Sequence, residues 1–205
     1  MSAQPQLMTE AEYLSMERVS PIKHEFYQGR IYAMTGASET HNLICMNVAA
    51  ALHTQLRRKA CRVYANDMRV AIPSTKLYTY PDIVIVCGQP VFNDEEQDTL
   101  LNPKVIIEVL SPSTERYDRG MKFQHYSRLE TISDYILVSQ NQRRIEHFVR
   151  QKTDQWLLDA ITSPDQLLVI DSVECSLNLD DVYEKVSLPE SHEGVTREMP
   201  QDSRQ

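Results

Sequence analysis

The spacing of apolar residues changes along the chain, and these changes predict the order of its helices and strands. Between residues 43 and 56, apolar side chains recur every three or four positions, which predicts a long helix that begins after Ser38. Near the N-terminus, Thr9 and Glu12 have the spacing of a capping box, which predicts the start of a short helix.

Alternating and continuous apolar runs predict the strands. Residues 24–35 alternate around Gly29, as in a β-hairpin. The runs at 82–87 and 104–110 are almost wholly apolar, which is typical of strands buried on both faces. The other predicted elements are strands at 63–72, 134–139, 144–150, 155–162 and 167–170, and helices at 115–130 and 179–186. This order predicts an α/β fold with a central mixed sheet flanked by helices.

Length and composition favour one globular domain. The chain has 205 residues, enough to bury a substantial core, and the fraction of charged residues is ordinary at 24%. We expect the domain to span residues 9–188, with polar and disordered segments at 1–8 and 189–205. Because neither a long apolar segment nor a signal peptide is present, we predict a cytoplasmic protein without membrane contact.

The four cysteines lack any CxxC pair. We therefore expect them to be reduced, mostly as small core residues, and we expect neither a zinc site nor a disulfide framework. The net charge of −8 argues against a protein that coats nucleic acid nonspecifically. Residues 53–76 are basic, with six lysines and arginines against one aspartate, which fits either a solvated helix end or a local surface that faces phosphate.

Two acidic residues interrupt the most apolar strands. Asp82 opens one of these runs and Glu108 lies near the end of the other. Carboxylates that converge in a core repel each other unless a cation lies between them, and Mg²⁺ or Mn²⁺ suits such oxygen ligands. Lys122, in the following predicted helix, has Asp118 and Tyr126 four residues to either side, on the same face. Two acids, a metal ion and a lysine are suited to phosphodiester hydrolysis.

Purely structural roles remain open for the same residues. Asp82 follows a proline and could bond backbone amides in a turn. Glu108 could pair with Lys122 or Arg119 as a buried ion pair. His41 lies in the first turn of the long helix, where a histidine is often only a satisfied polar group, and Glu25 by itself indicates little.

Five segments together resemble a known family. In chain order they are HEFYQGRIYAMTGASETH, NDMRVAI, YPDIVIV, VIIEVLSPSTERYDRGMKFQHY and DYILV. The order and spacing are similar to those of the Uma2 family of restriction-endonuclease-like proteins, over about residues 9–188. That family resembles the PD-(D/E)xK nuclease superfamily, whose fold is a mixed sheet with a metal site at one end of the central strands.

The resemblance implies a role for each acid and for the lysine. Asp82 matches the aspartate of the family motif, and Glu108 matches its second acidic position. The superfamily places a lysine two residues after that acid, but this chain has Leu110 there. The resemblance therefore implies that Lys122 takes the lysine's role, from the next helix.

The resemblance also implies ligands, a substrate and an assembly. Glu25 and His41 would line the same cleft, and the carbonyl of Val109 would join the metal ligands. The expected activity is that of an endonuclease cleaving DNA with Mg²⁺ or Mn²⁺, and the fold suggests a homodimer by analogy. The alternative from another class is an inactive nuclease-fold scaffold that binds nucleic acid or a protein.

Overall fold

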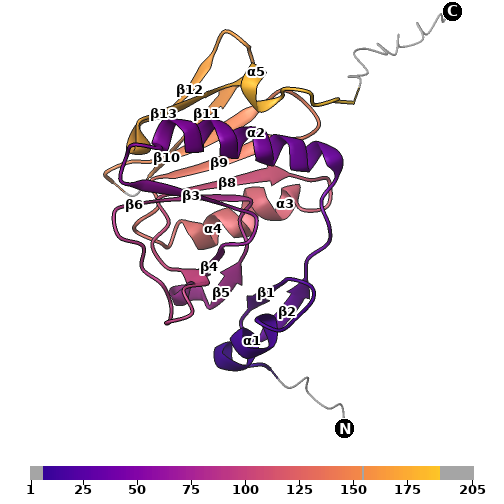
Figure 1. Ribbon diagram of the computed structural model, residues 1–205, viewed down its shortest axis with the longest axis vertical. Helices are drawn as coiled ribbons and strands as arrows, with labels where there is room; N and C mark the ends of the chain where they lie inside the picture. Colours follow the sequence, from indigo (N-terminus) through magenta and orange to yellow (C-terminus); the bar gives the residue numbers. More distant parts are fainter. Residues whose placement is uncertain (1–6, 154, 190–205) are drawn as a thin grey trace, which may run out of the picture.

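The computed structural model describes residues 7–153 and 155–189, and it places strands in three sheets (Figure 1). The helices are α1 (Glu10–Glu17), α2 (Glu39–Leu56), α3 (Glu115–Tyr117), α4 (Phe123–Tyr126) and α5 (Leu179–Val182). The strands are β1 (His24–Tyr27), β2 (Arg30–Ala33), β3 (Cys61–Ala65), β4 (Arg69–Ile72), β5 (Leu77–Thr79), β6 (Ile83–Cys87), β7 (Thr99–Leu100), β8 (Val105–Leu110), β9 (Asp134–Ser139), β10 (Ile145–Arg150), β11 (Trp156–Ile161), β12 (Leu167–Ile170) and β13 (Cys175–Asn178).

The central sheet has six strands in the order β11-β10-β9-β8-β6-β3. Strands β8 and β9 pair in parallel, whereas the other neighbours pair antiparallel, so the predicted central mixed sheet is confirmed. Figure 1 shows α2 along one side of this sheet and α3 and α4 on the other side. The sheet is therefore covered by helices, as expected for the α/β fold.

The apolar run of β6 is buried on both faces of the central sheet. Ile83 and Ile85 pack into the core that includes Ile44 of α2. Val84 and Val86 pack into a second core on the opposite face of the sheet, which includes Tyr126 of α4. All four side chains are fully buried. This two-sided burial explains why the run is continuous in apolar character instead of alternating.

A second sheet, in the order β2-β1-β5-β4-β7, carries the N-terminal hairpin. Thr9 and Glu12 form the predicted capping box at the start of α1. The hairpin turn has positive φ angles at Gln28 and Gly29, and at Gly29 the Cβ of Leu7 lies 2.8 Å from where a side chain would begin. Only glycine fits this turn without displacing the preceding segment.

The single strand predicted for residues 63–72 is wrong. The chain turns at Asn66, which has a positive φ, and forms β3 in the central sheet and β4 in the second sheet. The amide of Asn66 donates to the carbonyl of Asp82 at 2.8 Å, which ties this turn to the start of β6. The apolar pattern alone could not show this division, because the strand-like residues of β3 and β4 are almost continuous in the sequence.

The helix predicted for 115–130 is found from Glu115 to Tyr126, but it is not a regular α-helix throughout. A π-helical turn, Asp118–Lys122, separates α3 from α4. Single π-turns within helices often occur at functional positions, because the extra residue changes the direction of the side chains. Asp118 and Lys122, both in this turn, are almost fully buried.

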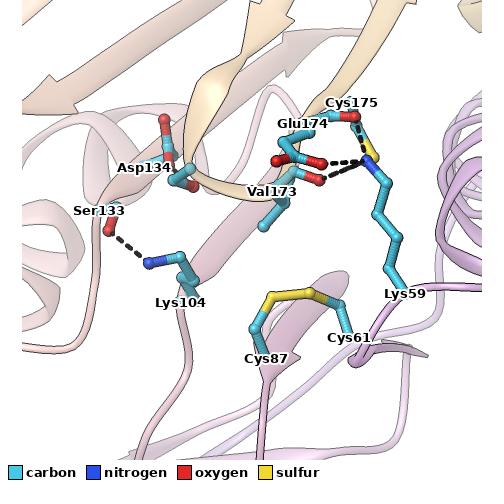
Figure 2. Close-up of a disulfide and its surroundings, with 10 residues drawn as sticks. Lys59, Cys61, Cys87, Lys104, Ser133, Asp134, Val173, Glu174 and Cys175 are labelled. Atoms are coloured by element: carbon cyan, nitrogen blue, oxygen red, sulfur yellow. Dashed lines mark hydrogen bonds and ion pairs between the residues drawn. A yellow bond between two sulfur atoms is a disulfide. The ribbon is translucent and has the colours of Figure 1, made fainter.

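The expectation that the cysteines are all reduced is wrong for one pair. Cys61 of β3 and Cys87 of β6 are directly opposite in the antiparallel register and form a disulfide (Figure 2). Cys45 and Cys175 are free and buried, as predicted. The spacing of 26 residues carried no CxxC signal, because strand pairing alone brings the two sulfurs together.

The basic segment 53–76 is partly occupied by structural contacts. Figure 2 shows Lys59 reaching toward Val173 and Glu174, whose carbonyl oxygens accept from its ammonium at 3.2 and 2.5 Å. Arg69 is only 2% exposed. These two cations therefore serve the fold and do not form an open phosphate-facing surface.

The ends of the chain were predicted to be disordered at 1–8 and 189–205. Residues 1–6 and 190–205 lie outside the described residues. Met8 is described, and its amide donates to the carbonyl of Gly29 at 2.9 Å, so it is anchored to the hairpin. Among the described residues, no helix has the length and apolar character needed to cross a membrane.

Candidate metal centre

Strand pairing brings the two strand acids together. Ile83 of β6 is paired with Ile107 of β8, so one further step in this antiparallel register places Asp82 beside Glu108. The backbone amide of Val109 donates to Oδ2 of Asp82 at 2.7 Å. The two carboxylates predicted to converge from separate sequence segments therefore lie at the same end of the central sheet.

Lys122 lies among three carboxylates. Its Nζ is 2.9 Å from Oε1 of Glu108, 3.3 Å from Oδ1 of Asp118 and 3.7 Å from Oε1 of Glu25. The lysine therefore reaches the acids although Leu110 occupies the position two residues after Glu108. These five residues make up what we call the carboxylate–lysine cluster: Glu25, Asp82, Glu108, Asp118 and Lys122.

Neutral groups hold these acids in place. The hydroxyl of Thr79 in β5 donates to Oε1 of Glu25, which fixes the hairpin acid against the second sheet. The hydroxyl of Tyr126 donates to Oε1 of Glu108 at 3.0 Å. Sequence reasoning placed Tyr126 on the same helix face as Lys122, but gave no signal for Thr79, which depends on pairing between β1 and β5.

The cluster holds more carboxyl groups than one lysine can balance if all of them are ionised. Burial raises the pKa of Glu108 to about 8, with the charges of Asp118 and Asp82 adding to the effect of burial and Lys122 opposing it. Burial likewise raises the pKa of Asp118. Burial alone would lower the pKa of Lys122, but Glu108, Tyr126, Asp118 and Glu25 together outweigh it and raise that pKa, so the lysine stays protonated.

His41 faces Asp82 from the first turn of α2. Ser38 caps this helix by accepting from the amide of His41 at 3.2 Å, and Nε2 of His41 lies 3.2 Å from Oδ2 of Asp82. Burial acts to lower the pKa of His41, but Asp82, with smaller contributions from Asp118 and the backbone of Val109, outweighs it and raises that pKa. The structure therefore brings His41 to the same place as the acids.

The donor set fits a hard divalent cation. Asp82 uses Oδ2 for its contacts with Val109 and His41, and Glu108 uses Oε1 for those with Tyr126 and Lys122. Within the described residues, the second oxygen of each carboxylate accepts no hydrogen bond. Two adjacent carboxylates, each with one such oxygen, are the type of ligand that Mg²⁺ and Mn²⁺ prefer.

The purely structural alternatives account for part of this geometry. Glu108 does form a buried ion pair with Lys122, as one alternative expected. Arg119 contacts Glu115 at 2.7 Å and also pairs with Glu146, so it takes no part in the cluster through these contacts. Asp82 does bond a backbone amide, but that of Val109 in the neighbouring strand and not one in its own turn.

The structure resembles a protein whose crystal structure is known. That protein, from Anabaena variabilis, is described as a putative nuclease belonging to DUF820, and the two folds superpose with a TM-score of 0.73 at 16% sequence identity. The alignment covers 88% of this chain and 99% of that one. At this identity the likeness establishes the restriction-endonuclease-like fold and nothing more specific.

Sequence relatives are closer but have no known activity. Two uncharacterized proteins of Synechocystis sp. align with this chain, one at 35% identity over 76% of this chain and 88% of the relative. The other is 33% identical over 87% of this chain and 92% of the relative. The Uma2 family, described as "Putative restriction endonuclease", matches residues 10–180. The chain therefore belongs to the Uma2 family.

Proposed function

We propose that this protein is a divalent-metal-dependent endonuclease that hydrolyses phosphodiester bonds of DNA. The observation that carries the proposal is the excess of acid in the carboxylate–lysine cluster, where one ammonium faces Glu108, Asp118 and Glu25 and a fourth acid, Asp82, lies beside Glu108. A purely structural ion pair needs one acid for each base, whereas a divalent cation accounts for the surplus. The family assignment supports the same activity.

Asp82 and Glu108 would hold the cation, together with the carbonyl of Val109 and water. A Mg²⁺ or Mn²⁺ ion bound there supplies charge stabilisation at the scissile phosphate and lowers the pKa of a bound water. The amide of Val109 already orients Asp82, and Tyr126 orients Glu108. Both acids thus have a fixed orientation before any ion or substrate binds.

Lys122 would act as a fixed positive charge. Because its pKa is raised, it keeps its proton at neutral pH and can donate to a phosphate oxygen but cannot serve as a general base. Glu25, which accepts a hydrogen bond from Thr79, would act as an auxiliary ligand or base. His41, whose pKa is raised beside Asp82, can donate to the phosphate or to the attacking water.

The N-terminal hairpin extends the site toward a polymer substrate. In the hairpin register, Glu25 is opposite Tyr32 and Tyr27 is opposite Arg30, so all four side chains share one face. Tyr32 is 49% exposed and Arg30 is also exposed. A cation and an aromatic ring beside the acids suit the phosphates and bases of a nucleic acid. A homodimer, which would bring two such sites to two strands, is part of this proposal by analogy only.

Cleavage of supercoiled plasmid with Mg²⁺ or Mn²⁺ tests the proposal. Wild type should nick the plasmid, and Asp82→Ala should lose at least about 100-fold in rate, because it removes a metal ligand. Asp98→Asn is the matched control, since Asp98 lies apart from the cluster and pairs with Arg18 and Arg69.

Titration calorimetry with Mn²⁺ separates a nuclease from an inactive scaffold. Binding that is lost in Asp82→Ala together with cleavage supports the nuclease. Equal nicking by wild type and Asp82→Ala would show that the activity is a contaminant, and absence of both Mn²⁺ binding and nicking in wild type would favour the scaffold.

A further inference from the structure

A thiol, that of Cys45, lies beside His41 at the edge of the carboxylate–lysine cluster. Cys45 is one helical turn after His41 in α2, and its Sγ is 3.5 Å from Nδ1 of the imidazole. The opposite nitrogen, Nε2, is 3.2 Å from Oδ2 of Asp82. Sulfur, nitrogen and oxygen atoms from these three side chains all lie within 4.8 Å of one another.

We propose that Cys45, His41 and Asp82 form a binding site for a thiophilic divalent cation, of which Zn²⁺ is the biological example. Thiolate and imidazole favour Zn²⁺ strongly over Mg²⁺, which selects oxygen ligands. One thiolate and one carboxylate balance the two charges of the ion, and the imidazole binds in its neutral form. The proton of the Cys45 thiol leaves to solvent as the sulfur–metal bond forms.

The local structure makes such a site accessible and ordered. Residues four apart on a helix face the same way, so α2 presents His41 and Cys45 together, and β6 brings Asp82 from outside the helix. The side chains of His41 and Asp82 are 14% and 20% exposed, which gives an ion a path from solvent. Cys45 is only 3% exposed and is fixed by the surrounding core.

The present contacts also show what must change on binding. An imidazole nitrogen binds an ion only when it carries no proton, so the ion takes the place of a hydrogen now shared with Asp82 or with Cys45. Three protein ligands leave a fourth tetrahedral position for water. Because Nδ1 faces the thiol and Nε2 faces Asp82, the imidazole ring must also turn so that one of its nitrogens points at an ion shared by the other two side chains.

Sharing of Asp82 gives the site a regulatory consequence. An ion held by Cys45, His41 and Asp82 competes with the Mg²⁺ position formed by Asp82 and Glu108, so Zn²⁺ would inhibit Mg²⁺-dependent cleavage. This consequence rests on the proposed function, whereas binding of the ion does not.

Cadmium is a suitable probe, because a cadmium–thiolate bond gives an ultraviolet charge-transfer band. The full chain is titrated with Cd²⁺ without thiol reductant, so that Cys61 and Cys87 stay paired. Wild type should develop the band and Zn²⁺ should remove it, whereas Mg²⁺, which competes only for Asp82, should raise the Cd²⁺ concentration needed without abolishing the band. Cys45→Ser should lose the band, and Cys175→Ser, which changes the other free buried thiol, should retain it.

Two further variants complete the test. His41→Gln should weaken Cd²⁺ binding by at least about tenfold, since even groups that only support a metal ligand contribute 10–100-fold. Cys45→Ala, which keeps an apolar group in the core, replaces Cys45→Ser if that variant melts early. A band that persists in the folded Cys45 variant, or no band in wild type, overturns the site. A Cd²⁺ band without Mg²⁺-dependent cleavage overturns only the nuclease proposal.

Discussion

Two charged clusters in this molecule differ in how acids and bases are matched. The carboxylate–lysine cluster at the end of the central sheet has four acids around one lysine. The second, which we call the arginine–aspartate cluster, consists of Arg18, Arg69, Asp94 and Asp98, paired at 2.7–2.8 Å. Both ion-pair networks link distant parts of the chain, but only the second has equal numbers of acids and bases.

The pKa values of the two clusters shift in opposite directions. Hydrogen bonds from Arg18 hold the pKa of Asp98 far below its usual range, against the effect of burial. Burial and neighbouring acids raise the pKa of Glu108 to about 8. A carboxylate whose pKa is lower in the folded protein than in the unfolded chain stabilises the fold when ionised. A carboxylate whose pKa is raised is costly to ionise in the fold unless a cation binds to it. Under the proposed function, the arginine–aspartate cluster would stabilise the fold and the carboxylate–lysine cluster would bind a cation.

The largest expected effect is on the rate of cleavage, which should depend on the carboxylate–lysine cluster and not on the arginine–aspartate cluster. Glu108→Gln and Asp98→Asn each replace one carboxylate by an amide of the same shape. Glu108→Gln should lower the plasmid cleavage rate by about 1,000-fold, because loss of a metal ligand removes several kcal/mol of transition-state stabilisation. Asp98→Asn should leave the rate per folded molecule unchanged. Comparable losses of rate in both variants would contradict the distinction.

The next largest effect is on the free energy of unfolding, which should depend more on the arginine–aspartate cluster than on Lys122. Arg69→Met should reduce the free energy of unfolding by about 1–3 kcal/mol, because it leaves buried Thr99 and Tyr80 without their donor and Asp98 with Arg18 alone. Lys122→Met should cost less, because Glu108, with its raised pKa, can take up a proton in place of the lost cation. Urea denaturation near neutral pH without added metal measures both values. An equal loss in the two variants would make Lys122 a structural partner.

The smallest effect is the pH dependence of metal binding. Below its pKa of about 8 Glu108 holds a proton that a metal ion must displace, so Mn²⁺ affinity should rise about tenfold per pH unit up to that value and then level off. Calorimetry at several pH values measures the slope of affinity against pH. Glu108→Gln has no carboxyl proton for the ion to displace at this position, so any remaining Mn²⁺ affinity should depend much less on pH. A flat profile in wild type would place the ion away from Glu108.

The sequence specified most of the local structure near the site. The capping box at Thr9, the hairpin at Gly29, the Ser38 cap and the two buried runs each depend on neighbouring residues, and each is found in the structure. Local preferences of this kind act over a few residues, so they are visible in the chain itself. The resemblance to Uma2 added the family, which the family match confirms.

Other features depend on pairing between distant segments. The π-turn that brings Lys122 to Glu108, the division of residues 63–72 into two sheets and the Cys61–Cys87 disulfide have no local signature. The contact of Cys45 with His41 follows from helix spacing, but Asp82 joins them only through the packing of α2 on the central sheet.

Sequence alone thus determined that acids interrupt two buried strands, because a carboxylate in an apolar run is costly and stands out. Only the tertiary structure decided that Asp82 and Glu108 are neighbours, that Lys122 faces three acids, and that a thiol lies beside them. The physical reason is that strand register and helix packing bring these groups together, and both depend on the whole core.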